Sequence, residues 1–336
     1  MAYHYENLKL EKGMYSQSGR SFAQTLEALD PSENYKGTSL EGLDAFQRQL
    51  KRFDIKVKGA GSDRVEKFFW STESAVLFPE FVSRVVRQGM EEESILPDIR
   101  LLRALWPDRE HAPHAGQFFT LRAWGADEAP FLSRPISVHK WEPETQTIEF
   151  LYQVIGEGTH KLAALKKGDT FQLTGPMGNG FDIPALAGQY RKIAVVGGGI
   201  GTAPMYQVTR ELAAAGVRPD VFFGFRDAPY CMEEYRSIAN LVKVSTDTGA
   251  VGFHGFVTQL YDPADYDAVL VCGPTVMMKN AARLCAEKGT PCFVSLEKKM
   301  ACGIGACLGC TCETRGGEGK SVCKNGPVFD ATEVFF

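Results

Sequence analysis

Five of the nine cysteines in this 336-residue chain lie between Cys302 and Cys323. Four of them follow the order C-x4-C-x2-C, with a fourth cysteine after twelve further residues, which is the spacing of plant-type two-iron ferredoxins. The surrounding segment is rich in glycine and too short to form a hydrophobic core of its own. Gly303, Gly305 and Gly309 leave out side chains where the backbone must bend, so that N–H groups can point at sulfur. The predicted ligands of a two-iron, two-sulfur cluster are Cys302, Cys307, Cys310 and Cys323.

Zinc, or a set of plain thiols, is the alternative for this tail. Zinc sites usually take paired C-x2-C units, and only Cys307 and Cys310 form one here. A disulfide framework is not expected in a chain without a secretory leader. Cys312 is predicted to be a surplus thiol, because a single residue separates it from Cys310. The cysteines outside the tail are expected to be buried or inert thiols: Cys231, Cys272, Cys285 and Cys292.

Length and composition place few further limits on the chain. A length of 336 residues allows two or three domains, since one core seldom grows past roughly 250 residues. The net charge of −4 gives no reason to expect binding to nucleic acid or to anionic lipid. We find no apolar run of the roughly 20 residues that span a bilayer and no leader sequence. A cytoplasmic protein without a membrane partner is therefore expected.

The hydrophobic pattern changes along the chain and predicts four regions. Residues 1–95 are polar, with helical spacing of apolar residues over Ser39–Phe53 and Pro79–Glu93. Ile99–Leu173 carries several short strands separated by turns, which is typical of a small β-barrel. From Arg191, apolar strands alternate with helices, which indicates a doubly wound parallel sheet covered on both faces. The predicted divisions are an N-terminal extension (1–95), a small barrel (96–187), a parallel-sheet domain (188–290), and a last strand with the cluster module (291–336).

Two turns in the parallel-sheet region are candidate nucleotide sites. The sequence Gly197-Gly-Gly-Ile-Gly-Thr-Ala-Pro204 follows a buried strand and opens a helix, so that backbone N–H groups can face a pyrophosphate. It departs from G-x-G-x-x-G because Thr202 holds the last position. Cys272-Gly-Pro274 ends a later parallel strand, where ligands of open α/β sheets bind. Purely structural turns are the alternative. The candidate residues are Gly197, Gly198, Gly199, Gly201, Thr202, Cys272, Gly273 and Pro274.

Two further motifs in the barrel region are candidates for binding a flavin. Arg134-Pro-Ile-Ser137 is expected between two strands, where an Arg beside a proline can hold a phosphate and the Ser hydroxyl can reach a flavin ring nitrogen. Gly156-Glu-Gly-Thr159 ends the next strand as a backbone nest suited to a diphosphate. An exposed Arg before a turn is the alternative for the first motif. Selectivity for a 2′-phosphate stays open, because Arg226 would attract one and Asp227 would repel it.

The order of these motifs, from Arg134-Pro-Ile-Ser137 through Ser295-Leu-Glu-Lys-Lys-Met300 to Val322-Cys-Lys-Asn-Gly-Pro-Val-Phe329, resembles the electron-transfer subunits of NAD-dependent bacterial dihydroorotate dehydrogenases. These belong to the ferredoxin–NADP reductase superfamily. The resemblance covers residues 96–336 and implies FAD, a two-iron cluster and NAD(H) as cofactors. Gln153 stands where the family often has Arg. The implied FAD contacts are Arg134, Pro135, Ile136, Ser137, Leu151, Tyr152, Gln153, Gly158 and Thr159.

The resemblance also implies a function and a partner. A catalytic dihydroorotate dehydrogenase subunit would oxidise dihydroorotate on its own FMN, within a heterotetramer that serves pyrimidine biosynthesis. Electrons would then pass through the cluster and FAD to NAD⁺, and no residue of this chain need act as an acid or base. The family also has a barrel strand shortly before Ile95–Leu102, where this sequence predicts a helix.

Two other functions remain open on the sequence alone. A reductase of the same build could serve a ferredoxin or a sulfur compound, because the docking surface decides the acceptor. Tyr35–Leu50 and Ser74–Ser83 resemble the N-terminal arm of some tailed-phage major capsid proteins. That resemblance would imply a fusion, and a structural or assembly role dominated by residues 1–95.

Overall fold

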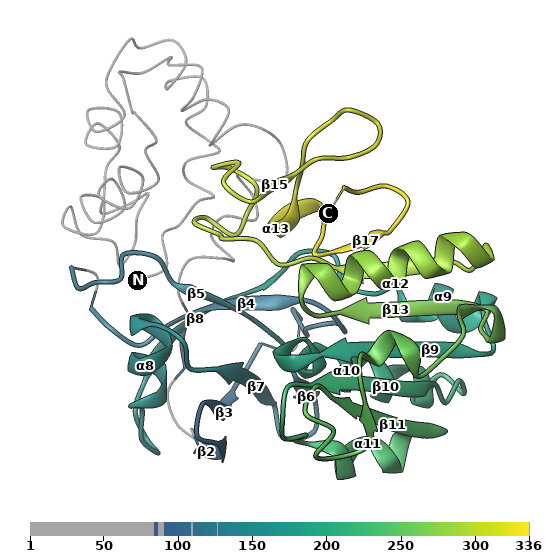
Figure 1. Ribbon diagram of the computed structural model, residues 1–336. Helices are drawn as coiled ribbons and strands as arrows, with labels where there is room; N and C mark the ends of the chain where they lie inside the picture. Colours follow the sequence, from purple (N-terminus) through teal and green to yellow (C-terminus); the bar gives the residue numbers. More distant parts are fainter. Residues whose placement is uncertain (1–83, 87–90, 109, 126, 336) are drawn as a thin grey trace, which may run out of the picture.

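The computed structural model describes residues 84–86, 91–108, 110–125 and 127–335 of the chain (Figure 1). It contains a barrel of two four-stranded sheets, a seven-stranded sheet flanked by helices, and a C-terminal module that holds the clustered cysteines. The capsid-like segments and the helix expected over Ser39–Phe53 lie outside the described residues. No helix in the described ranges is both long and apolar enough to cross a membrane.

The barrel is antiparallel throughout. One sheet has the order β1 (Arg84–Val86), β8 (Phe171–Met177), β4 (Phe118–Arg122) and β5 (Arg134–Ser137). The other has the order β2 (Glu91–Leu96), β3 (Ile99–Leu105), β7 (Thr147–Gln153) and β6 (Lys140–Glu142). Alternate side chains fill the interior, where Trp106, Phe119 and Phe150 meet edge to face. The short helix α8 (Glu157–Ala163) follows β7. The tetrapeptide that we expected between strands, Arg134–Ser137, is itself strand β5.

The helix predicted over Pro79–Glu93 is wrong, because the described part of this segment forms strands. Strand β1 pairs antiparallel with β8, and β2 pairs antiparallel with β3. The barrel therefore starts before residue 96, and the first strand that the sequence seemed to lack is present. The physical reason is that open edges of β8 and β3 need hydrogen-bond partners, and tertiary pairing of this kind outweighs a short helical pattern.

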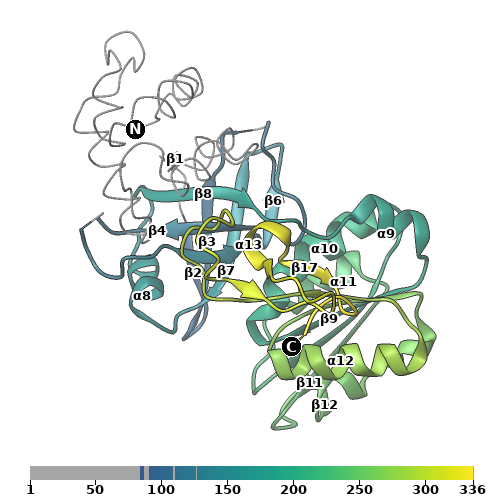
Figure 2. The same cartoon turned by 90° about the horizontal axis from the view of Figure 1, so that it is seen from above.

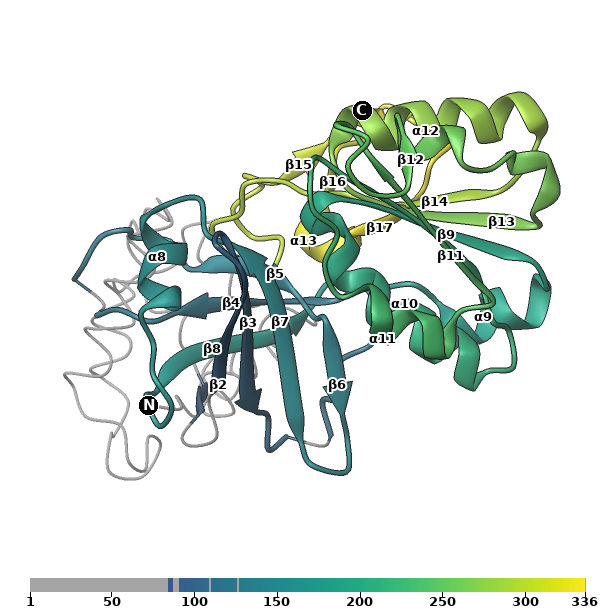
Figure 3. The ribbon, with the colours of Figure 1, turned by 60° about the horizontal axis from the view of Figure 1, so that its bottom comes forward.

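The seven-stranded sheet has the order β12-β11-β10-β9-β13-β14-β17, and only β17 runs antiparallel to its neighbour. Ile193 and Val195 of β9 pack with α9, α10 and α11, whereas Ala194 and Val196 pack toward α12. Figure 3 shows α12 on one face and the other three helices on the opposite face. The elements are α9 (Ile183–Gln189), β9 (Ile193–Gly198), η1 (Gly199–Gly201), α10 (Thr202–Ala214), β10 (Asp220–Phe225), α11 (Met232–Ile238), β11 (Leu241–Thr246), β12 (Phe253–His254), η2 (Val257–Gln259), η3 (Pro263–Asp265), β13 (Ala268–Cys272), α12 (Thr275–Lys288) and β14 (Cys292–Ser295).

The C-terminal module is joined to this sheet at both ends. The chain leaves β14, forms the cysteine loop, and continues through β15 (Thr311–Cys312), β16 (Lys320–Ser321) and α13 (Val322–Asn325). It then returns as β17 (Val328–Asp330), which pairs with β14. Figure 2 shows this module, in yellow, over the junction between the barrel and the α/β domain. The cysteines are thereby held next to both domains.

Candidate functional site

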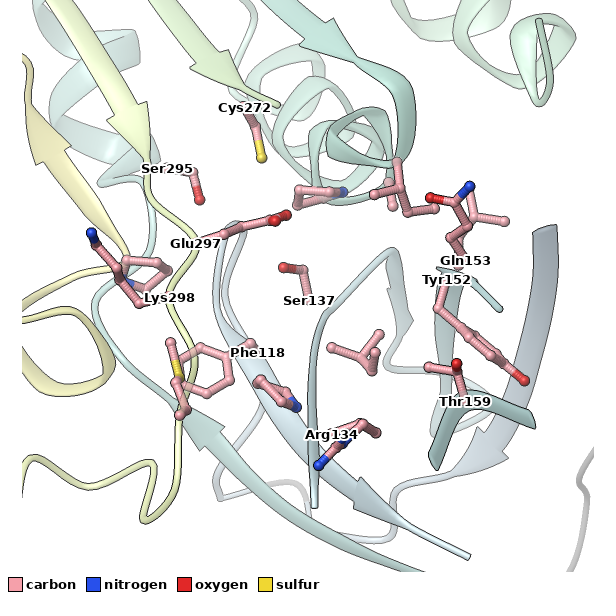
Figure 4. Close-up of a pocket in the computed structure, with 18 of the residues that line it drawn as sticks. Phe118, Arg134, Ser137, Tyr152, Gln153, Thr159, Cys272, Ser295, Glu297 and Lys298 are labelled. Atoms are coloured by element: carbon pink, nitrogen blue, oxygen red, sulfur yellow. The ribbon is translucent and has the colours of Figure 1, made fainter. Parts of the chain in front are cut away.

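A cavity of about 290 Å³ lies where the barrel, the α/β domain and the cysteine module meet (Figure 4). Strands β5 and β7 supply the barrel wall, and Ala203, Cys272 and Ser295 supply the opposite wall. We call this space cavity 1. Every residue expected to contact FAD lines it except Gly158: Arg134, Pro135, Ile136, Ser137, Leu151, Tyr152, Gln153 and Thr159. The sequence motifs from three separate segments thus converge on one hollow.

Arg134 lines this cavity with a hydrogen-bond donor that has no partner among the described residues. Its Nη2 donates to the carbonyl of Leu132 at 2.7 Å, while its Nε is buried without a hydrogen-bond partner among the described residues. Burial lowers the pKa of the guanidinium, yet an Arg keeps its charge in proteins. A buried donor without a partner costs free energy, so this N–H fits the phosphate of a bound cofactor.

Gly158 lies behind the cavity wall and is required by packing. A Cβ atom there would lie 2.9 Å from Cη2 of Trp124 and 3.0 Å from Cδ of Arg134. The N–H groups of Ile155 and Gly156 both donate to Oγ1 of Thr159 at 3.0 Å. The turn therefore uses these two N–H groups internally, and the expected backbone nest has fewer free donors than its sequence suggests.

Gln153 has a partner of its own. Its Nε2 donates to Oδ2 of Asp98 at 2.7 Å, so the amide is held at the mouth of the cavity. Glu297 and Ser137 point into the same space (Figure 4). Desolvation by the surrounding walls raises the pKa of Glu297. Sequence reasoning missed Glu297, which could have been found from its position directly after the strand and before the cysteine loop.

A second cavity, of about 670 Å³, lies at the carboxyl ends of β9, β10 and β11. We call it cavity 3, after the three strands at whose ends it lies. Of the candidate nucleotide residues, Gly198, Gly199 and Pro274 line it, and Cys272 lines cavity 1. The others line neither cavity. A Cβ on Gly201 would lie 2.5 Å from Cα of Gly273, so these two glycines let the two turns pack together. Gly197 likewise makes room for Phe223, and Thr202 donates its hydroxyl to the carbonyl of Gly199 at 2.9 Å.

Several residues of cavity 3 were not predicted. Ser245 is 1% exposed, and its hydroxyl has no hydrogen-bond partner in the described structure. It is the penultimate residue of β11, two residues before Asp247. Ligands of parallel sheets bind at such strand ends, and this position is the signal that could have identified both residues. Arg226, which the sequence offered as a possible attractor of a 2′-phosphate, also lines the cavity and pairs with Asp227 at 3.7 Å. Other unpredicted lining residues include Phe256, Lys279, Asn280 and Arg283.

The cysteine loop directs backbone N–H groups at all four predicted ligand sulfurs. Gly305 donates to Sγ of Cys323 at 3.0 Å, Cys307 to Cys302 at 3.4 Å, Gly309 to Cys307 at 3.4 Å, and Cys323 to Cys310 at 3.4 Å. Hydrogen bonding with the Cys323 thiol, which can donate to one sulfur at a time, lowers the pKa of Cys302 to about 5 and that of Cys310 to about 6. The same contacts raise the pKa of Cys323, and burial raises that of Cys307. The backbone N–H groups on all four sulfurs stabilise the thiolate, which is the form that binds metal.

The spacing of the four cysteines, with one C-x2-C pair and two single cysteines, is typical of a two-iron cluster rather than of a zinc ion. Zinc needs four ligands about one point, whereas a two-iron cluster divides its four cysteines between two metals. The Cys312 thiol instead donates to the carbonyl of Lys320 at 3.4 Å. Its position agrees with a spare thiol.

Cavity 1 and the cysteine loop share a wall. Phe118 and Met300 line the cavity and pack in the same apolar cluster as Cys310 and Cys323. A Cβ on Gly303 would lie 2.5 Å from Sδ of Met177, which shows how closely the loop meets the barrel. The two candidate redox sites are therefore in contact through side chains of one apolar cluster.

Comparisons with known proteins agree with this architecture. Residues 297–335 match the iron–sulfur cluster binding domain of dihydroorotate dehydrogenase B. The electron transfer subunit of dihydroorotate dehydrogenase B (NAD(+)) from Clostridium acetobutylicum is 45% identical over 219 residues, which is 65% of this chain and 85% of the relative. The same subunit from Clostridium perfringens is 41% identical, over 68% of this chain and 90% of the relative.

Solved structures give the same fold. An NADH-dependent reduced ferredoxin-NADP oxidoreductase is 29% identical with a TM-score of 0.66, covering 74% of this chain and 90% of that one. The ferredoxin reductase of carbazole 1,9a-dioxygenase is 21% identical with a TM-score of 0.52, covering 62% and 67%. Fold and site together define an oxidoreductase of the ferredoxin-reductase class, with a barrel and a nucleotide-binding domain. Within that class, the chain belongs to the family of dihydroorotate dehydrogenase B electron transfer subunits.

Proposed function

We propose that this chain carries electrons between a catalytic dihydroorotate dehydrogenase subunit and NAD in pyrimidine biosynthesis. It would bind FAD in cavity 1, a nicotinamide nucleotide in cavity 3 and a two-iron cluster on the cysteine loop. FAD, when bound, exchanges hydride with a nicotinamide and single electrons with a cluster. The observation that carries the proposal is the shared wall of Phe118 and Met300 between cavity 1 and the cysteine loop.

In cavity 1, the residues of this chain would bind and orient the flavin cofactor. The free Nε–H of Arg134 would donate to a phosphate, and the Ser137 hydroxyl would donate to the ring system. Ile136, Leu151 and Phe118 line the cavity with apolar surface and would exclude water. The proposed FAD contacts remain Arg134, Pro135, Ile136, Ser137, Leu151, Tyr152, Gln153 and Thr159, with Gly158 in a packing role.

The nucleotide site is proposed at cavity 3, with Gly198, Gly199 and Pro274 at its turn end. The unpartnered hydroxyl of Ser245 would donate a hydrogen bond to a ribose, and the carboxylate of Asp247 would accept one from a ribose hydroxyl. Gly197, Gly201, Thr202 and Gly273 would shape the turns without touching the ligand, because packing between the two turns already accounts for them. Cys272 would lie between the two cavities.

The four cysteines Cys302, Cys307, Cys310 and Cys323 are proposed as the cluster ligands. The backbone N–H groups of the loop would stabilise their negative charge, as hydrogen bonds to the sulfurs of iron–sulfur clusters do. The catalytic subunit would dock where it can exchange electrons with this loop, in a hetero-oligomer that we expect to be a heterotetramer.

The proposed domain limits follow the strands. The flavin domain would run from β1 to residue 187, the nucleotide domain over 188–290, and the cluster module over 291–336. The role of residues 1–83 and a cytoplasmic location stay predictions from the sequence.

Spectroscopy and metal analysis of anaerobically purified protein would test this function. We expect a brown-yellow protein with one FAD and two irons with two labile sulfides, and reduction of dyes by NADH. Addition of the catalytic subunit should give dihydroorotate-dependent reduction of NAD⁺. Stoichiometric zinc without labile sulfide would contradict the cluster assignment.

A ferredoxin is the second candidate partner, because a reductase that acts with ferredoxin shares this architecture and similar sequence. The same preparation would decide between them. Electron transfer from NADH to a ferredoxin, together with no activity toward dihydroorotate when the catalytic subunit is present, would favour this alternative.

A further inference from the structure

Helix α10 connects the two cavities to the flank of the barrel. It starts at the glycine turn, where Ile200, Ala203 and Pro204 line cavity 1 while Gly198 and Gly199 line cavity 3. Further along, α10 packs against strand β6 (Figures 1 and 3). Whatever holds α10 against β6 therefore also sets how the two cavities face each other.

The first contact lies next to cavity 1. Nδ1 of His139 is 2.7 Å from the carbonyl oxygen of Ala203, and the imidazole is buried. Because a carbonyl oxygen can only accept, Nδ1 carries the proton. His139 follows Ser137 by two residues, so this hydrogen bond ties the end of a flavin-facing strand directly to the first turn of α10.

Two further contacts continue along the helix. The N–H of Trp141 donates to Oε1 of Gln207 at 3.0 Å, and Gln207 is 4% exposed. Arg210 donates from Nη1 to the carbonyl of Trp141 at 2.8 Å and from Nη2 to Oε1 of Glu142 at 2.7 Å. The three contacts join positions 139, 141 and 142 of the barrel to successive turns of α10, at Ala203, Gln207 and Arg210.

These hydrogen bonds fix the relative orientation of α10 and the barrel across an interface that is otherwise apolar. Barrel residues such as Leu101 and Leu151 share one hydrophobic core with Val208 and Leu212 of α10. Apolar burial is non-directional, so small sliding motions of α10 change its free energy little. A hydrogen bond, in contrast, weakens steeply when its angle departs from linear. Neither Gln207 nor Arg210 lines cavity 1 or cavity 3, so any effect on the ligands must come through α10.

We propose that His139, Gln207 and Arg210 are positioning residues that set the distance and angle between the nicotinamide and the flavin. This inference rests on the proposed function. Hydride transfer needs the reacting atoms about 3–3.5 Å apart, and a misplacement of about 1 Å costs roughly a hundredfold in rate. The three contacts act where α10 meets the barrel. This helix lines cavity 1 through Ala203 and Pro204, and it continues directly from the glycine turn that lines cavity 3.

The test compares two pairs of variants of the full-length, FAD-loaded chain. Arg210→Met removes both hydrogen bonds and keeps the stem, and Arg210→Lys can restore one. His139→Leu removes the bond to Ala203, whereas His139→Asn places an amide N–H where Nδ1 stood. The matched control is Arg236→Met, which changes an exposed arginine on α11 that forms an ion pair with Glu233.

Stopped-flow measurements with NADH and with 4-deuterated NADH give the rate of flavin reduction, its isotope effect and the dissociation constant of NADH. We expect Arg210→Met and His139→Leu to slow hydride transfer at least about tenfold, with unchanged FAD content and NADH affinity. The long-wavelength charge-transfer absorbance of the mixed nicotinamide–flavin complex should weaken in parallel. His139→Asn and Arg210→Lys should recover part of both signals.

Three results would overturn the proposal. The first is an unchanged rate of flavin reduction and an unchanged charge-transfer absorbance in Arg210→Met. The second is a loss of FAD or of thermal stability in the variants that matches their loss of rate, and the third is an equally large effect of Arg236→Met. Should His139→Leu not fold, the Arg210 variants decide, since that side chain is 29% exposed and its replacement should be tolerated. A wild-type chain whose flavin NADH does not reduce would instead refute the proposed function.

Discussion

At the scale of single residues, the five tail cysteines differ in what surrounds their sulfurs. Cys307→Ser removes one proposed ligand, so we expect the cluster and electron delivery to the partner to be lost while NADH–dye activity survives. Cys312→Ser should keep the cluster, because a hydroxyl can also donate to the carbonyl of Lys320. Iron and labile-sulfide analysis distinguishes the two. Cluster loss in Cys312→Ser alone would reverse the ligand assignment.

Arg134 offers a second test at this scale. Its buried Nε–H has no partner among the described residues, and a hydrogen bond to a charged group contributes about 1.5–3 kcal/mol. We therefore expect Arg134→Ala to weaken FAD binding about ten- to hundredfold, by titration of the apoprotein with FAD. Arg236→Ala on α11 is the control and should bind FAD as the wild type does. Equal affinities in both variants would remove Arg134 from the site.

At the scale of elements, strands β1 and β2 determine how far the chain can be truncated from its N-terminus. A chain starting at residue 80 keeps both strands, and we expect it to bind FAD and to react with NADH. A chain starting at Pro97 exposes the edges of β8 and β3, and uncovered strand edges favour aggregation. It should aggregate or lose FAD, as measured by circular dichroism and flavin fluorescence. Full FAD binding by the shorter chain would show that these strands are dispensable.

The strands also show which elements a local sequence pattern can predict. The apolar strands expected after Arg191 are confirmed, among them β9, β10 and β13. They are buried on both faces, so their apolar runs are unambiguous. The helix predicted over Pro79–Glu93 is wrong because the apolar residues Phe81, Val82, Val85 and Val86 recur at a short spacing that fits one helix turn or a strand equally well.

At the scale of the whole molecule, the junction of the two domains should make stability depend on pH. Burial lowers the pKa of His139 below its usual value of 6.5, because the imidazolium is disfavoured without water. Below about pH 6.5 the unfolded chain takes up a proton that the folded chain resists, so the free energy of unfolding falls as the pH falls. Above that pH this residue adds no pH dependence.

The difference between wild type and His139→Asn isolates this effect from the titration of carboxylates. We expect the midpoint of urea unfolding to fall more between pH 7.5 and pH 5.5 in the wild type than in His139→Asn. Parallel changes in both proteins would mean that His139 does not couple protonation to the stability of the domain junction.

The sequence by itself determined the local chemistry of this protein. The spacing of Cys302, Cys307, Cys310 and Cys323, the glycine turn after β9 and the Arg-Pro-Ile-Ser strand each depend on neighbours within a few residues. Such short-range patterns can be recognised in a sequence because turn glycines, metal ligands and buried strands each restrict the residue types at their positions directly. The order of the motifs along the chain was enough to indicate the family.

Only the tertiary structure decided how these pieces meet. It separated the glycines that line cavity 3, such as Gly199, from Gly201 and Gly273, which pack one turn against another. It brought Ser245 and Glu297 into cavities and joined the cysteine loop to cavity 1 through Phe118 and Met300. The physical reason is that these contacts join residues far apart in the chain. No local periodicity of the sequence indicates which distant side chains will line the same cavity.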